Sequence, residues 1–154
     1  MARPNARLGC RAAATLPQLA SSRFVLAVAA IALGRARQAL ELATRYAKER
    51  QQFGRPLSDN QAIQFMLASS ATELDAAALL IGRAALTESS PDIAKANRGS
   101  MSAALAACDR ALQIFGGAGY TREVPIERAL RDCQFLAQNF GTPSFQLIAE
   151  SLGG

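Results

Sequence analysis

The chain has 154 residues, half of them hydrophobic, and its 17 basic and 12 acidic side chains give a net charge of +5. It contains no histidine, which excludes Ser-His-Asp triads, Cys-His pairs and histidine-based metal sites. Its three cysteines stand at unpatterned spacing, which argues against a disulfide framework or a metal site and fits a reducing compartment. No apolar run reaches the roughly 18 residues of a membrane span, so we expect one domain without a span.

The basic charge is concentrated at the N-terminal end. Six arginines precede the first carboxylate, Glu41, and the remainder of the chain is close to neutral. With few aromatic residues and no nucleic-acid motif, this distribution argues against binding to DNA or RNA.

Residues 1–21 differ in composition from the rest of the chain. Arginines recur every four residues from Arg3 to Arg11 without acidic neighbours, and two prolines interrupt the segment. A transit peptide has this composition, but so has an arbitrary basic leader or a gene-boundary artefact. We expect the segment to be disordered and the folded domain to occupy residues 22–154. The compartment stays open between a bacterial cytoplasm and a mitochondrial matrix.

Residues 22–52 show the apolar spacing of a long helix. Ser22 is a suitable N-cap, and Glu41 and Arg45 are spaced as a supporting ion pair. A glycine and a proline within Phe53–Leu57 predict where the helix stops. Leucines recur at every seventh position, and alanines fill the same stripe: Leu26, Leu33, Leu40, Ala29, Ala36, Ala43 and Ala47.

The rest of the chain predicts further helices joined by short loops. A second long helix covers residues 58–88, and a third begins after the N-cap Ser90, with Pro91 at its first position. A shorter helix follows from Pro125 to about Ala137, and a last short one covers 144–152. This pattern predicts an all-α, antiparallel, up-and-down helical bundle.

The third helix ends in a glycine-rich stretch, Gln113–Tyr120. Glycine adopts positive φ and lets another backbone or a ligand approach closely. The stretch fits a plain helix cap and turn, and it also fits an open backbone surface at a binding site.

Four motifs occur in order along the chain: Glu49–Leu57, Asn60–Gln64, Gln113–Tyr120, and the Glu127-Arg128 and Arg131-Asp132 pairs before Gly141-Thr142. Together they closely resemble the C-terminal helical domain of the acyl-CoA dehydrogenases. The resemblance covers nearly everything after residue 22. It implies a flavoenzyme that oxidises acyl-CoA thioesters to 2-enoyl-CoA, in which a carboxylate removes the α-proton and the β-hydrogen leaves as hydride to FAD. It also implies an oligomer whose core this domain forms.

The resemblance also implies which residues contact the cofactor of a neighbouring subunit. One group touches this FAD or lies near it: Arg50, Gln51, Gln52, Phe53 and Gln61. A second group meets its adenosine–pyrophosphate end: Gln113, Ile114, Phe115, Gly116 and Gly117.

The chemistry of these residues agrees with that assignment. A pyrophosphate suits a forked donor such as Arg50 and backbone N–H groups such as those of Gly116 and Gly117. Arg50 alone would equally fit a solvated charge at a helix end. A third implied group, Gly141 at the substrate and Thr142 at the flavin, matches the turn beside the thioester.

Two departures from the family pattern bear on catalysis. Members carry a helical domain and a β-barrel domain before this one, where this chain has about 22 unrelated residues. Most members place the catalytic glutamate immediately before the Gly-Thr turn, and others place it on the first long helix. Those positions are Phe140 and Phe24 here, so no catalytic base is assigned. Two alternatives therefore stay open, a non-catalytic subunit that completes another chain's flavin site and a truncated fragment.

Overall fold

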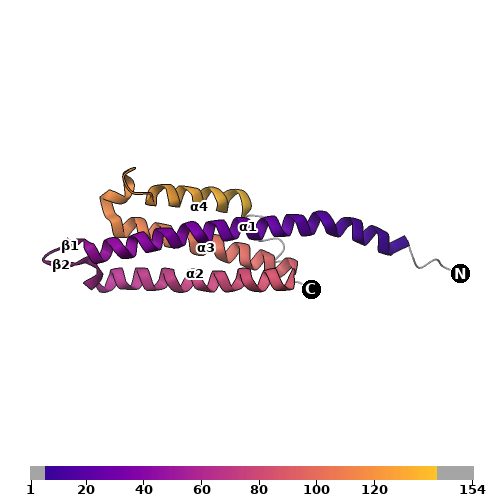
Figure 1. Cartoon of the computed structure of the whole chain (residues 1–154), viewed down its shortest axis with the longest axis horizontal. Coiled ribbons are helices and arrows are strands. Elements are labelled where there is room, and N and C mark those ends of the chain that lie inside the picture. The colour runs from indigo at the N-terminus through magenta and orange to yellow at the C-terminus, as the bar shows by residue number, and fades with distance from the viewer. Residues whose placement is uncertain (1–5, 142–154) are drawn as a thin grey trace.

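The computed structural model describes residues 6–141, with side chains from Arg23 onward. Four helices form an up-and-down bundle in which α1 (Ala6–Glu49), α2 (Gln61–Thr87) and α3 (Ser90–Phe115) lie side by side (Figure 1). The shorter α4 (Ile126–Phe140) packs on α1 and α3. The predicted all-α bundle is confirmed.

Helix α1 begins earlier than the sequence predicted. It starts at Ala6, whereas the sequence predicted a helix start near Ser22, and the division into a leader 1–21 and a folded domain 22–154 stays a prediction. Alanine, leucine and arginine, all strong helix formers, make up most of residues 6–21 and outweigh Pro17. Residues 1–5 and the last predicted helix, 144–152, lie outside the described residues.

Helix α1 is followed by a small hairpin, which the sequence had not predicted. The helix ends at Glu49, and the two-residue strands β1 (Gln51–Gln52) and β2 (Arg55–Pro56) pair antiparallel. The turn between them is Phe53 (φ 54°) and Gly54 (φ 78°). Positive φ at both positions matches the right-handed twist of a hairpin, and glycine accepts it without strain. Residues 51–52, predicted as helix, are therefore strand.

The other helix boundaries follow local capping chemistry. After a 3₁₀ turn at Leu57–Asp59, the side chain of Asn60 accepts a hydrogen bond from the N–H of Ala62 at 3.0 Å and caps α2. Ser89 is the N-cap position of α3, one residue before the predicted Ser90. Helix α4 continues past Ala137 to Phe140.

Small residues fill most of the core. Alanines of α1 form a buried stripe among the residues with described side chains, and larger buried side chains come from the other helices, such as Leu74, Met101 and Ile126. Alanine has little side chain to keep helix axes apart, so α1 and α3 can approach closely. The buried alanines of α1 are Ala29, Ala32, Ala36, Ala39, Ala43 and Ala47.

Ion pairs join the helices at the edge of this core. Arg35 of α1 binds Asp132 of α4. Arg110 of α3 binds both carboxylate oxygens of Glu73 of α2, at 2.8 and 2.9 Å. The predicted Glu41–Arg45 pair is not formed in the described structure, where all seven ion pairs involve other residues.

The outer face of α2 is apolar and uncovered. Phe65, Leu79 and Leu86 are 62, 77 and 89% exposed. Among the described helices, α2 is the one long and apolar enough to cross a membrane, and 17% of its most apolar window is buried. One such helix is weak evidence for a membrane span, because core helices of soluble proteins meet the same criterion.

Candidate functional site

The up-and-down topology brings the ends of α1 and α3 together at one end of the bundle (Figure 1). The hairpin after α1 and the 3₁₀ segment Gly116–Tyr120 after α3 both lie there. Two motifs that are far apart in the sequence therefore meet, and a pocket of about 540 Å³ lies between them.

The pocket contains most of the predicted FAD-contacting residues. Seven of them line it: Arg50, Gln52, Gln113, Ile114, Phe115, Gly116 and Gly117. Gln51, Phe53 and Gln61 are exposed but do not line the pocket.

Sequence reasoning missed five residues that complete the pocket wall. They are Tyr46, Leu57, Asn60, Ile63 and Ala118. The rings of Tyr46 and Phe115 stack with centroids 4.2 Å apart and planes 21° apart. This stack joins the last turns of α1 and α3, and both rings line the pocket between the two motifs. The sequence offered one signal for Tyr46, its position one helical turn before Arg50.

Arg50 has the freedom to bind an anion. It is exposed just past the end of α1 and forms no ion pair within residues 23–141. Its backbone is fixed, because its N–H donates to the carbonyl of Tyr46 at 2.8 Å and its carbonyl accepts from Leu57 at 2.9 Å.

Gly116 turns the chain at the end of α3. Its φ of 57° and ψ of −136° lie in a region that only glycine adopts readily. Its N–H bonds to the carbonyls of Leu112 and Gln113, so it caps the helix and is not free for a ligand. A Cβ at either Gly116 or Gly117 would meet nothing within 4 Å, so this backbone surface is open.

The remaining predicted residues lie at the opposite end of α4. Gly141 is buried there, and its N–H donates to the carbonyl of Ala137 at 3.0 Å. A Cβ at Gly141 would stand 2.5 Å from that carbonyl oxygen, so no side chain fits without a shift. Thr142, the predicted partner of Gly141, lies outside the described residues. Helix α4, about 22 Å long, separates this region from the pocket.

The two positions that house the catalytic base in the resembled family meet beside Gly141. The rings of Phe24 and Phe140 pack edge to face, with centroids 5.7 Å apart. Asn97 of α3 is fully buried and donates its side-chain N–H to the carbonyl of Phe140 at 2.7 Å. The sequence signal for Asn97 was a polar residue within the apolar stripe of α3.

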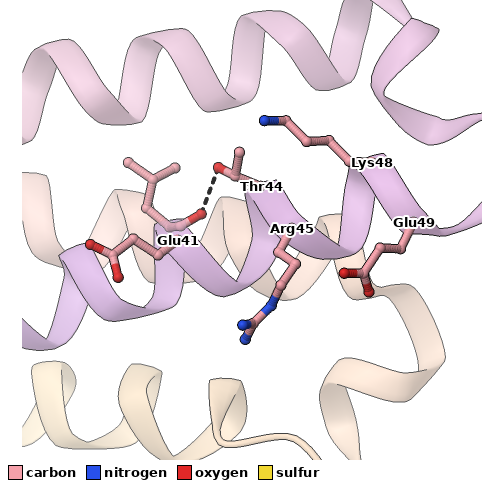
Figure 2. A pocket seen from close by; sticks show the side chains of 6 residues that line it. Glu41, Thr44, Arg45, Lys48 and Glu49 are labelled. Atoms are coloured by element: carbon pink, nitrogen blue, oxygen red, sulfur yellow. Dashed lines mark hydrogen bonds between the residues drawn. The ribbon is translucent and has the colours of Figure 1, made fainter.

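A second hollow, of about 470 Å³, lies along α1 itself. Glu41, Arg45 and Glu49 follow one another on successive turns, and Thr44 donates its hydroxyl to the carbonyl of Leu40 at 2.8 Å (Figure 2). This is a solvated helix face with mixed charges, and none of the predicted cofactor residues lines it. Among the described residues, no three acidic or cysteine side chains gather closely enough to hold a metal ion.

Comparison with known proteins decides the family. The sequence profile described as "Acyl-CoA dehydrogenase, C-terminal domain" matches residues 9–150. The chain belongs to the acyl-CoA dehydrogenase family. The match begins well before Ser22, which agrees with the early start of α1.

Individual relatives agree with this assignment. The chain is 41% identical to an acyl-CoA dehydrogenase of Bacillus subtilis, over 84% of this chain and 36% of that protein. It is 44% identical to 3-sulfinopropanoyl-CoA desulfinase of Cupriavidus necator, over 80% of this chain and 32% of the relative. The solved butyryl-CoA dehydrogenase of Megasphaera elsdenii superimposes with a TM-score of 0.79 at 35% identity, covering 83% of this chain and 35% of that one.

The chain thus spans about a third of the length of the relatives it matches. Members of the family are FAD-dependent and act on acyl-CoA compounds. This acyl-CoA dehydrogenase domain corresponds to their C-terminal helical part.

Proposed function

We propose that this chain serves as the C-terminal domain of an FAD-dependent enzyme acting on acyl-CoA, in which it contacts the cofactor of a neighbouring subunit and forms the oligomer core. One observation carries the proposal. The α1 motif and the glycine-rich motif, predicted to share a dinucleotide, line one pocket at one end of the bundle.

The pocket residues fit the adenosine–pyrophosphate end of FAD. Arg50 offers a forked cation that pairs with no carboxylate among residues 23–141, and this geometry suits a pyrophosphate. Gly116 and Gly117 let a ligand approach the main chain. Gln52 and Gln113 add amide groups at the same pocket, suited to hydroxyl or phosphate oxygens. FAD, when bound, would supply the hydride acceptor; the role of these side chains is to bind and orient it.

The hairpin tip is suited to contact a second subunit. Phe53 is 95% exposed and has a φ of 54°, an uncommon conformation for a bulky side chain. An exposed aromatic ring held in such a conformation is consistent with a residue placed for a partner. In this proposal Phe53, Gln51 and Gln61 contact the neighbouring subunit or its FAD from outside the pocket wall.

At the other end of α4, the proposal places Gly141 and Thr142 beside the thioester. A carboxylate is needed there to remove an α-proton, and the two family positions for it are Phe24 and Phe140. In this proposal the chain therefore contacts the thioester at that end, but neither of the two positions supplies a proton acceptor.

The phenylalanine pair also supports a second candidate function. The chain could complete another subunit's flavin site within a hetero-oligomer without performing the chemistry.

A flavin absorbance spectrum tests the proposal. We expect the purified chain to be colourless and to bind added FAD weakly by calorimetry, because it lacks the contacts that would offset the cost of ordering the ligand. Fused behind the first two domains of butyryl-CoA dehydrogenase, it should retain yellow FAD after gel filtration. A fusion that folds, as judged by circular dichroism, but stays colourless would overturn the proposal.

A further inference from the structure

The structure places two cysteines together in the core, although their spacing along the chain does not predict that they meet. Cys108 of α3 and Cys133 of α4 are both fully buried, and their sulfur atoms are 3.7 Å apart. A disulfide requires the sulfurs to come about 1.7 Å closer. Neither thiol belongs to the flavin pocket or to the region around Gly141.

We propose that Cys108 and Cys133 form an intramolecular disulfide site that covalently joins α3 to α4 under oxidising conditions. The surroundings are suited to this reaction. The two thiols form a directed pair in which Cys108 donates to the sulfur of Cys133, and Cys133 donates to the carbonyl of Ala32 at 3.8 Å. Both sulfurs lie in the same core cluster, in which many of the buried side chains are alanines.

The pair has a natural order of reaction. The hydrogen bond from Cys108 lowers the pKa of the Cys133 thiol, whereas the bond to Cys133 and burial raise the pKa of Cys108. The Cys133 thiolate attacks one sulfur of a low-molecular-weight disulfide and releases one thiol. Cys108 then loses its proton and attacks the Cys133 sulfur, which releases the second thiol. In total, two protein thiols and one small disulfide become one protein disulfide and two small thiols.

Access to the pair requires local opening of α4. This helix has 15 residues, of which three are buried, and within the described residues it packs on α1, α3 and the 3₁₀ segment Gly116–Tyr120. Oxidation is therefore expected to be slow, at a rate set by the opening of α4. Once formed, the bond would fix α4, which connects the glycine-rich segment to Gly141.

The test uses the full chain and glutathione disulfide as the oxidant. Trypsin places the three cysteines on three different peptides, 8–11, 99–110 and 132–154, so each pairing gives a different cross-linked mass. We expect the native protein to lose two hydrogen masses and to yield the 99–110/132–154 pair. Its thermal midpoint should rise by roughly 5–15 °C and return to the starting value with dithiothreitol.

Three outcomes would overturn the proposal. One is that the native thiols are still reduced after an incubation many times longer than the time in which the urea-unfolded chain is fully oxidised, because slow opening of α4 delays the reaction but does not prevent it. Another is that the main product is a stable mixed disulfide or a bond to Cys10. The third is a thermal shift of equal size in Cys133→Ala, because this matched variant keeps Cys108 and Cys10 but cannot form the proposed bond.

Discussion

The ring of Phe24, on α1, packs edge to face against the ring of Phe140, at the end of α4, with centroids 5.7 Å apart. In the resemblance to the acyl-CoA dehydrogenases, these are two separate positions, and the catalytic carboxylate occupies one or the other. Their contact is what one would expect if a base on either helix served the same substrate atom. In this chain the place is occupied by an apolar pair.

The first prediction follows from that pair. In a fusion of this domain with the first two domains of a working relative, flavin bleaching by acyl-CoA should be essentially absent. Phe140→Glu should raise the bleaching rate by about a hundred- to ten-thousand-fold, because a positioned base contributes this much to proton transfer. Stopped-flow absorbance measures the rate, and Phe140→Gln is the matched control without a basic group. Rapid bleaching by the unchanged fusion would show that another residue accepts the proton.

The second prediction concerns Arg50. In the same fusion, Arg50→Ala should weaken FAD retention by roughly tenfold or more, because a charge-assisted contact to phosphate is lost. Arg45→Ala, on α1 one turn before its end and outside the pocket, should leave retention unchanged. The FAD dissociation constant, measured by fluorescence, gives the comparison, and equal effects of the two changes would remove Arg50 from the site.

Asn97 is predicted to hold the end of α4. Asn97→Ala should lower the free energy of unfolding by about 1–3 kcal/mol, because a buried hydrogen bond to the carbonyl of Phe140 is lost. Asn139→Ala removes an exposed side-chain bond to the carbonyl of Phe135 and should cost at most about 0.5 kcal/mol. Urea denaturation of both variants separates the two cases. A cost at Asn97 no larger than that at Asn139 would contradict the assigned role.

The Arg110–Glu73 pair should stabilise the bundle more than the exposed Arg37–Asp75 pair. Arg110→Ala should cost about 1–2 kcal/mol of unfolding free energy and Arg37→Ala less than about 0.5 kcal/mol, because only Arg110 binds both carboxylate oxygens in a partly buried place.

The pH dependence of the Arg110 contribution has a definite sign. The hydrogen bond with Glu73 raises the pKa of Arg110 in the folded state. Its contribution is then complete below the pKa of unfolded arginine and is lost only as pH rises through the folded value. The difference between wild type and Arg110→Ala should thus be equal at about pH 6 and about pH 9. A difference that falls between these two values would contradict this account.

The outer face of α2 should cause association. Phe65, Leu79 and Leu86 are exposed, and the three charges of α2 are all paired with other helices, namely Glu73, Asp75 and Arg83. We expect the wild-type chain to form dimers, tetramers or aggregates, which light scattering would detect. The double change Leu79→Glu with Leu86→Glu should lower the molar mass measured by the same method. Phe135→Glu is the control, because Phe135 is an apolar residue on α4 that is 60% exposed. A wild-type chain that is a stable monomer at micromolar concentration would exclude association.

Most of the fold could be predicted because its signals are local. Heptad leucines, the Pro91 start and the glycine stop of α3 gave the helices and their order. The start of α1 and the hairpin could not be predicted in this way. At Pro17 and at Gln51–Gln52 local propensities compete, and the conformation there depends on the whole surrounding segment. The pairing of Cys108 with Cys133 depends on how α4 packs against α3, which spacing in the sequence does not encode.

The same division applies to the candidate site. Arg50 and Gly116 were found because motifs of the family carry them. Tyr46 and Asn97 were missed because neither lies in one of the four motifs, and the sequence signal at each position does not tell which residues of another helix lie beside it. Their roles appear only when a second helix is placed beside them.

The alanine stripe of α1 reverses the usual pattern of sensitivity to mutation. In most cores, damage comes from shortening a large side chain, and the loss scales with the cavity left behind. Here the buried face of α1 has little left to shorten. Substitution by a larger side chain should destabilise this core instead. A valine or leucine at Ala36 or Ala43 would force the axes of α1 and α3 apart along their length. Over evolution, such a surface can exchange alanine for glycine or serine, but larger residues can enter only when the facing helix changes with it.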